Sequence, residues 1–151
     1  MPWWPEDEWA GKRRGAGCFL CAHAHHSNAE GDFVEATAFS FIHLKKNQSH
    51  PGHACVIFRR HEPELHDLTP VELLGFTTDV AWVARAIEAA FNPVKLDQLI
   101  IGHISPHLHC HVFPQYESDD PHATPNIHDS MLVLPEAEQR ARVELLRRHL
   151  S

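Results

Sequence analysis

The sequence has no apolar run long enough to cross a bilayer, and it is poor in basic residues. A membrane-spanning helix needs about 20 consecutive apolar residues, and no stretch of this chain approaches that length, so we expect no membrane partner. The 13 lysines and arginines are outnumbered by 20 acidic residues, which gives a formal charge of −7. Because nucleic-acid binding usually relies on a basic surface, we expect no nucleic-acid partner either.

The chain also has few cysteines and no leader-like start. Residues 1–17, MPWWPEDEWAGKRRGAG, lack the basic segment and apolar core of a secretory signal, so we expect a cytoplasmic protein. In that compartment the four cysteines do not indicate a disulfide framework. No repeat, linker or second core interrupts the sequence. Residues 1–17 are therefore predicted to form an N-terminal arm, and residues 18–151 a single domain.

Hydrophobic patterns predict alternating pairs of strands and single helices. Residues 33–44 and 54–60 are rich in β-branched and aromatic side chains, and 97–102 and 107–115 have the same character. A long helix is predicted over 69–91, where apolar residues recur every three or four positions. A second helix follows Pro135. The order ββ-α-ββ-α is typical of an α+β domain with an antiparallel sheet.

The start of the long helix has a recognisable pattern. Thr69 and Glu72 have the spacing of a capping box, in which each side chain bonds the other residue's backbone amide. Pro70 occupies the first helical position, where its missing N–H is not needed. We expect the helix to begin here and to end at Asn92-Pro93.

The stretch SPHLHCHVFPQY, residues 105–116, contains three alternating histidines. In a strand, His107, His109 and His111 point to one face, while the intervening apolar residues Leu108, Cys110 and Val112 point into the core. A single strand histidine is most often structural. Three together are costly to bury without a role, because each ring has two nitrogens that need partners. Metal binding and phosphate-directed nucleophilic chemistry are the two functional interpretations.

The pattern HLHCHVF resembles the motif of the histidine triad family of nucleotidyl hydrolases and transferases. Three stretches share this resemblance: CFLC at 18–21, HPGHACVIFRRHEPELHDLTPVE at 50–72 and IGHISPHLHCHVFPQY at 101–116. The resemblance implies a HIT-like α+β fold. This fold has an antiparallel sheet of about five strands, one long helix packed on it and a C-terminal helix. It also implies a homodimer.

The resemblance assigns the catalytic roles to particular histidines. His109 matches the nucleophile, which attacks the α-phosphate of a nucleotide and forms a covalent nucleotidyl-histidine. His111 matches a phosphate-side partner, and His53 of the Pro-Gly-His stretch matches a further histidine of the site. His103 and Ser105 stand where the family has polar phosphate contacts, although Ser105 is equally well explained as a turn hydroxyl.

The resemblance also implies a metal site. In similar members zinc is held by the Cys-x-x-Cys pair, by the histidine of a basic-His turn and by the first triad histidine, which correspond here to Cys18, Cys21, His61 and His107. Two cysteines and two histidines form a closed tetrahedral site, so the zinc is expected to be structural. The alternative interpretation is a pair of free thiols. On the zinc interpretation the three triad imidazoles divide into one metal ligand, one nucleophile and one phosphate partner.

Four substrate-side positions depart from the family pattern. Lys45 stands where an Asp or Asn commonly holds the ribose, Asp97 where some relatives have Asn, Gln115 where Arg is usual, and His103 where Asn or Gln is found. A shifted loop could offer His43 or Asn47 for the ribose instead of Lys45. We expect His103, Ser105, Lys45, Asp97 and Gln115 to line the substrate site.

Three functions are compatible with these patterns. The first is an enzyme that acts on a nucleoside phosphate, a phosphoramidate or a dinucleoside polyphosphate. The second is a non-catalytic, zinc-stabilised nucleotide sensor with the same fold. The third is a metal-handling protein that uses its 15 histidines.

Overall fold

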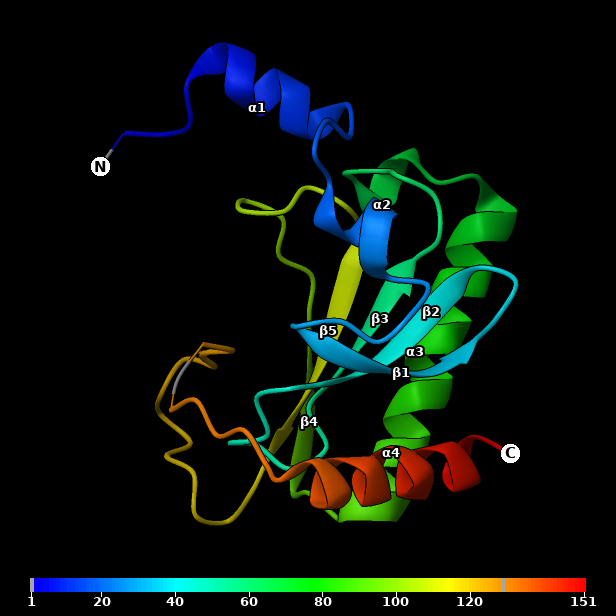
Figure 1. Cartoon of the computed structure of the whole chain (residues 1–151), viewed down its shortest axis with the longest axis vertical. Helices are drawn as coiled ribbons and strands as arrows, with labels where there is room; N and C mark the ends of the chain where they lie inside the picture. The colour runs from blue at the N-terminus through cyan, green and yellow to red at the C-terminus, as the bar shows by residue number, and fades with distance from the viewer. Residues whose placement is uncertain (1, 129) are drawn as a thin grey trace.

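The computed structural model describes residues 2–128 and 130–151, which build one antiparallel sheet with helices against it (Figure 1). The sheet has five strands in the order β1-β2-β3-β5-β4. The strands are β1 (Gly31–Ala36), β2 (Ser40–Lys45), β3 (Ala54–Phe58), β4 (Lys95–Leu99) and β5 (His109–Gln115). The helices are α1 (Glu6–Arg13), α2 (Phe19–His23), the short 3-10 helix η1 (Leu65–Asp67), α3 (Pro70–Phe91) and α4 (Glu136–Leu150). The predicted α+β fold with a long helix and a C-terminal helix is confirmed.

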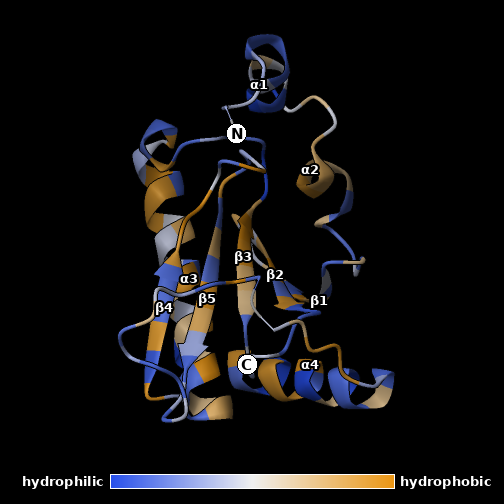
Figure 2. Cartoon of the chain, turned by 90° about the vertical axis from the view of Figure 1, so that its left-hand side faces the viewer, coloured by the Kyte–Doolittle hydropathy of each residue, from blue (hydrophilic) through white to orange (hydrophobic). Residues whose placement is uncertain are grey.

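The hydrophobic core lies between one face of the sheet and the helices α3 and α4. Alternate residues of β2, β3 and β5 are fully buried there, and they pack with the α3 residues Phe76, Val83 and Ile87. Figure 2 shows orange and blue residues alternating along α4, as expected of a helix that packs on one side only. Burial of each large aliphatic side chain stabilises the fold by about 1.5–3 kcal/mol. The prediction that Leu108, Cys110 and Val112 face the core is confirmed.

Residues 33–44 were predicted to be one strand, and this prediction was wrong. They form two strands, β1 and β2, joined by a tight turn at residues 37–39. The Thr37 hydroxyl accepts hydrogen bonds from the amides of Phe39 and Ser40 and donates one to the buried Asp79 carboxylate of α3, 2.6 Å away. A threonine turn has no glycine or proline to mark it in the sequence, so the strand-like pattern continues through it.

The predicted strand over 107–115 begins two residues later, at His109. Leu108 pairs with other segments, because its amide donates to the Glu62 carbonyl and its carbonyl accepts from the Phe58 amide. His107 therefore lies in the bend before β5. The other predicted strands also shift at their ends: β4 runs from 95 to 99 instead of 97 to 102, and β3 stops at Phe58.

The prediction for the long helix is confirmed in detail. The Thr69 hydroxyl accepts from the Glu72 amide at 3.2 Å, and the Glu72 carboxylate accepts from the Thr69 amide at 3.0 Å. The helix ends at Asn92, which adopts a left-handed conformation with φ of 52° before Pro93. In the described part of the chain, no helix combines the length and apolar character needed to cross a membrane.

Gly75 of α3 is expected to be intolerant of a side chain. A Cβ atom at this position would lie 2.3 Å from the Phe39 ring, far inside van der Waals contact. Gly75→Ala should lower the free energy of unfolding by about 1–3 kcal/mol, because the aromatic ring of the β1–β2 turn must move. Urea unfolding measures this loss. Ala81→Gly, at an exposed position of the same helix, gives the cost of a helix propensity change alone. A Gly75→Ala variant as stable as the parent would contradict the packing described here.

Candidate active site and metal centre

The second face of the sheet, opposite the helical layer, carries the histidines. The register pairs Cys55 of β3 with His111 of β5, and Ile57 with His109. Because side chains alternate along a strand, His109 and His111 lie on the same face as Cys55 and Ile57. His53, two residues before Cys55, joins them. The three predicted catalytic histidines therefore lie together in the structure.

His53 and His111 form a buried hydrogen-bonded pair. The Nε2 atom of His53 lies 3.0 Å from Nδ1 of His111, and both side chains are almost completely buried. Burial disfavours their charged forms and is the main cause of both low pKa values. It lowers the pKa of His53 to about 3, with a smaller contribution from Lys45, and that of His111 to about 2, with smaller contributions from His109 and His53. Both imidazoles are neutral near pH 7, so one ring donates the shared hydrogen bond and the other accepts it.

These low pKa values predict a pH-dependent stability. Between pH 6.5 and 3 the unfolded chain binds protons at His53 and His111 that the folded chain does not, so stability falls as the pH decreases. Each histidine contributes about 1.4 kcal/mol per pH unit to this slope. His111→Asn should reduce the slope of the free energy of unfolding against pH, between pH 6 and pH 4.5, by about 1.4 kcal/mol per pH unit. Urea unfolding at fixed zinc concentration measures both slopes, and equal slopes would contradict the burial of a neutral His111.

His109 is held in one orientation by the chain itself. Its Nδ1 lies 2.6 Å from the carbonyl oxygen of His107, which can only accept, so Nδ1 carries the proton and donates it. The other nitrogen, Nε2, is left with a lone pair. Burial lowers the pKa of the His109 imidazole, and this further favours the neutral form. The His109 ring is half-buried and stands 5.2 Å from the His111 ring, centroid to centroid. A neutral imidazole with a lone pair on Nε2 therefore stands beside a second imidazole.

Three of the predicted substrate residues share the histidine face. Lys45 lies two residues beyond His43, which pairs with Cys55, so its side chain points to this face. Its ammonium is 3.6 Å from the Glu30 carboxylate. Asp97 pairs with Phe113 in the register, and the Gln115 side chain donates to its carboxylate at 3.1 Å. The side chains of Gln115 and Asp97 are thus hydrogen-bonded to each other at the β4 side of the site.

His103 and Ser105 lie in the loop between β4 and β5, which leads into the triad. The His103 carbonyl accepts a hydrogen bond from the Trp4 indole, and the Ser105 carbonyl accepts one from the His107 amide. The His103 side chain is exposed and that of Ser105 is half-buried. The structure therefore brings these residues near the triad through the loop backbone.

The two alternatives for the ribose, His43 and Asn47, are both used structurally. His43 is buried, and its Nε2 lies 2.6 Å from the Ala24 carbonyl. The Asn47 side chain accepts from the amides of Ser49 and Leu132, which attaches residues 132–133 to the end of β2. Lys45 thus points to the histidine face, while His43 and Asn47 support the surrounding chain.

Cys18, Cys21, His61 and His107 form a compact cluster of potential metal ligands. Their ligand atoms all lie within 4.8 Å of one another. Sγ of Cys21 is 3.4 Å from Nδ1 of His61 and 3.4 Å from Nδ1 of His107, and Sγ of Cys18 is also 3.4 Å from Nδ1 of His107. A tetrahedral zinc with bonds of about 2.0–2.3 Å separates its ligand atoms by roughly 3.5 Å. The donor set and its spacing fit zinc.

The two histidines of this cluster are oriented by the backbone. The Nε2–H of His107 donates to the Phe58 carbonyl at 2.6 Å, and that of His61 donates to the Arg13 carbonyl at 2.9 Å. Both rings therefore present a bare Nδ1 to the cluster, as a metal requires. Gly15 allows the close approach, because a Cβ there would lie 3.2 Å from the His61 ring. The cluster joins α2 to the bend before β5.

A comparison with protein-family models identifies this arrangement. The HIT domain model matches residues 27–118, which include the central sheet and the triad. The chain belongs to the HIT family. Among curated proteins, this chain is 36% identical over 85 residues to the asymmetrical bis(5'-nucleosyl)-tetraphosphatase of Schizosaccharomyces pombe. The match covers 53% of this chain and 46% of that protein, so it spans about half the length of the curated relative.

Solved HIT structures share the fold of most of this chain. A histidine triad protein from Bradyrhizobium japonicum superposes with a TM-score of 0.72 at 21% identity, over 81% of this chain and 92% of that one. A Zn-bound histidine triad family protein from Mycobacterium smegmatis superposes with a TM-score of 0.61 at 20% identity, over 88% of this chain and 92% of that one. A HIT family protein from Bacillus anthracis superposes with a TM-score of 0.59 at 27% identity, over 74% of this chain and 82% of that one. The architecture of this chain is therefore the HIT fold.

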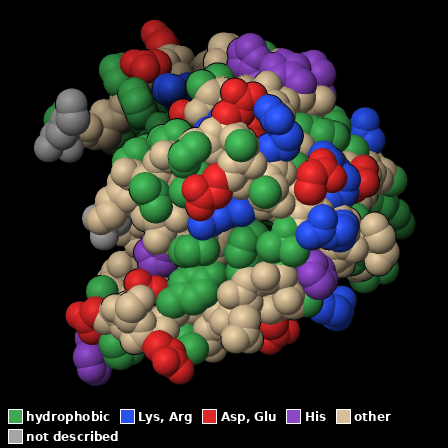
Figure 3. Space-filling model, turned by 60° about the horizontal axis from the view of Figure 1, so that its bottom comes forward, with side chains coloured by type: hydrophobic (Ala, Val, Ile, Leu, Met, Phe, Trp, Pro, Cys, Tyr) green, Lys and Arg blue, Asp and Glu red, His purple; other side chains and the backbone are tan. Residues whose placement is uncertain are grey.

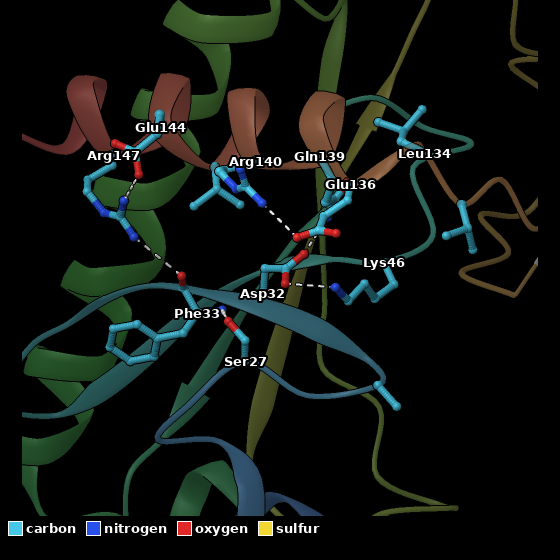
Figure 4. A pocket seen from close by; sticks show the side chains of 13 residues that line it. Ser27, Asp32, Phe33, Lys46, Leu134, Glu136, Gln139, Arg140, Glu144 and Arg147 are labelled. Atoms are coloured by element: carbon cyan, nitrogen blue, oxygen red, sulfur yellow. Dashed lines mark hydrogen bonds and ion pairs between the residues drawn. The ribbon is translucent and has the colours of Figure 1, made fainter.

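A cavity of about 680 Å³ lies elsewhere in this HIT protein, between β1 and α4 (Figure 4). Its charged side chains pair with one another: Lys46 with Asp32 at 2.8 Å, Arg140 with Glu136 at 2.6 Å, and Arg147 with Glu144. Seen with the α4 end turned forward, the surface mixes basic and acidic side chains (Figure 3). The cavity contains none of the triad residues.

Sequence reasoning missed one neighbour of the site. Trp4, in the predicted arm, donates from its indole Nε1 to the His103 carbonyl at 2.7 Å. The two residues are 99 positions apart, and no short-range pattern connects them. The only sequence signal is the concentration of tryptophans near the N-terminus, at positions 3, 4 and 9.

Proposed function

We propose that this HIT protein is a nucleotidyl hydrolase or transferase with His109 as its nucleophile. One observation carries the proposal: Nδ1 of His109 is committed to the His107 carbonyl, which leaves a lone pair on Nε2. A neutral imidazole fixed in this way is a nitrogen nucleophile at neutral pH. The similarity to a bis(5'-nucleosyl)-tetraphosphatase supports a nucleotide as the substrate.

The reaction has two displacement steps at the α-phosphorus. In the first, Nε2 of His109 forms a bond to phosphorus while the bond from phosphorus to the leaving group breaks. The leaving group keeps the electron pair and takes a proton from solvent. In the second, a water oxygen bonds to phosphorus and the N–P bond breaks, which releases the nucleoside monophosphate and a proton and restores neutral His109. In a transferase, another nucleophile replaces water.

The neighbouring groups can stabilise the phosphate in both steps. Burial is the main cause of the lowered pKa of His53, His109 and His111, and the charge of Lys45 adds to it, so this charge also attracts an anionic phosphoryl group placed beside them. His111 shares a hydrogen bond with His53 through Nδ1, so its Nε2 is a donor when His53 carries the shared proton and an acceptor when His111 carries it. We propose His103, Ser105, Asp97 and Gln115 as the surrounding substrate contacts.

Zinc is proposed as a structural ion held by Cys18, Cys21, His61 and His107. Its chemistry there is to bind two thiolates and two neutral imidazoles in a closed set, with no open position for substrate. The four residues attach α2 and the segment after β3 to the bend before β5. His107 supplies the carbonyl that orients His109, so a rigid His107 also keeps the nucleophile in place.

We propose that the protein acts as a homodimer through α3 and β4. β4 is an edge strand, and a groove between it and α3 is lined by apolar residues that include Val80, Leu96 and Ile100. Val94 and Ile100, beside β4, are 61% and 49% exposed. Light scattering at micromolar concentration should give twice the 17.2 kDa chain mass, and Leu96→Glu should give the monomer. A monomeric parent protein would contradict the dimer.

A substrate panel tests the proposed function directly. Pure zinc-loaded protein is incubated with adenosine 5'-phosphoramidate and with diadenosine tetraphosphate, and AMP release is followed by chromatography. Turnover of either compound supports the nucleotidyl hydrolase. Tight binding of both compounds without turnover would instead favour the nucleotide sensor. This alternative is tested because Lys45 and Gln115 depart from the family pattern at substrate-side positions.

A further inference from the structure

The N-terminal segment carries aromatic groups that the core does not use. Three of the four tryptophans, Trp3, Trp4 and Trp9, lie within the first nine residues. No residue of α1 is buried. Trp3 is 60% exposed and packs edge-to-face with Trp9, their ring centroids 5.1 Å apart. Tryptophan is on average a largely buried residue, so the exposed Trp3, packed on a half-buried Trp9, indicates a surface with another role.

The segment is attached to the loop that leads into the triad. The Trp4 indole donates to the His103 carbonyl at 2.7 Å, and the Lys12 ammonium lies 4.5 Å from the Trp4 ring centroid. Figures 1 and 2 place the segment at the end of the sheet where β5 begins, and β5 begins with His109. An aromatic surface and a cation therefore lie beside the β4–β5 loop, at the end of the sheet where β5 begins.

The other end of α1 is attached to the metal-ligand cluster. The Arg13 carbonyl accepts from His61 at 2.9 Å, and the Arg13 guanidinium pairs with Glu64 at 2.8 Å. The segment is thus held at Trp4 by the β4–β5 loop and at Arg13 by the cluster. This double attachment gives the tryptophans a defined position relative to the triad.

We propose that residues 2–13 form one wall of the nucleotide site, against which the base of the nucleotide stacks. The inference rests on the proposed function and names its base-binding element. Trp3 and Trp4 supply the aromatic faces, and stacking on indole accepts any base because every base has a π-face. Lys12 supplies a positive charge for a phosphate in a chain of net charge −7. Trp4 also positions the 102–105 loop through its bond to the His103 carbonyl.

Tryptophan fluorescence of the full-length, zinc-loaded chain tests this proposal. AMP is the probe, and ribose 5-phosphate, which lacks a base, is the matched ligand. AMP should change the fluorescence and bind at least about ten-fold more tightly than ribose 5-phosphate. The double variant Trp3→Ala/Trp4→Ala should weaken AMP binding by about ten-fold. It should weaken ribose 5-phosphate binding by a clearly smaller factor, because only the Trp4 bond to the 102–105 loop affects that ligand. Isothermal titration gives the affinities independently of the fluorophores.

Two controls separate stacking from loss of structure. Trp82→Phe, in α3 on the opposite side of the sheet, should bind AMP like the parent. Trp4→Phe keeps an aromatic face but removes the indole donor, so it should retain most of the AMP affinity. The zinc content of every variant should equal that of the parent.

The result that overturns the inference is equal binding of AMP and ribose 5-phosphate by the parent. Unchanged AMP binding by the double variant would overturn it as well, even if the protein turns over nucleotides. Arm-dependent AMP binding in a protein with no turnover would support the inference and reject the proposed function. The two proposals can therefore fail separately.

Discussion

Replacing His109 with alanine should lower kcat by more than about 10⁴-fold and leave the fold intact. The change removes the attacking nitrogen and little buried apolar surface, because the ring is only half-buried. The rate of AMP release from the substrate that the parent turns over measures the loss. Thermal unfolding should give a melting temperature within a few degrees of the parent.

The neighbouring histidines give matched controls for this experiment. His111→Asn should lower the rate less than His109→Ala does, because it removes one phosphate partner among several. His26→Ala, at an exposed position in the segment after α2, should have no effect. Full activity in His109→Ala would reject the assignment of the nucleophile.

Removal of the metal ligands should have the largest effect on stability. His61→Ala or Cys21→Ser should release zinc and lower the melting temperature by about 10 °C or more, because binding energy at a closed site is largely folding energy. His107→Ala should also lose activity, because loss of the imidazole detaches from the cluster the bend whose backbone carbonyl orients His109. Elemental analysis and differential scanning calorimetry measure the two quantities.

An exposed histidine of the same region provides the control for zinc loss. His66, in η1, is 79% exposed at its side chain and is outside the cluster, so His66→Ala should retain zinc and stability. Less than about half an equivalent of zinc in protein purified without chelator would count against the structural site. A chelator that removes zinc without shifting the melting temperature would also contradict it.

The sequence predicted the helical layer and the histidine face better than the strand boundaries. The capping box at Thr69 and the alternation at 107–112 are local patterns, and local patterns act directly on backbone conformation. The turn at Thr37 is held by a hydrogen bond from the Thr37 hydroxyl to the carboxylate of Asp79, 42 positions later. The division of residues 33–44 into β1 and β2 therefore could not be predicted from the local sequence. The resemblance supplied the fifth strand that the patterns did not.

The same distinction applies to the site. His53, His109 and His111 were assigned by resemblance, and the structure brings them together on one face. The tautomer of His109 depends on the bend before β5, which leaves the His107 carbonyl free to accept its hydrogen bond. The contact between Trp4 and His103 joins two residues that are 99 positions apart in the sequence. Neither feature has a pattern in the sequence, since both arise from tertiary packing.

Mass spectrometry of the trapped intermediate tests the central claim most directly. The parent protein is mixed with the substrate that the panel identifies and quenched in mild base, where a phosphorus–nitrogen bond to histidine survives better than in acid. It is then analysed intact and after digestion. We expect a mass increase of one nucleotidyl group on the peptide that contains residues 107–111, mapped to His109 and absent from His109→Ala. A nucleotidyl group on any other residue would contradict the account.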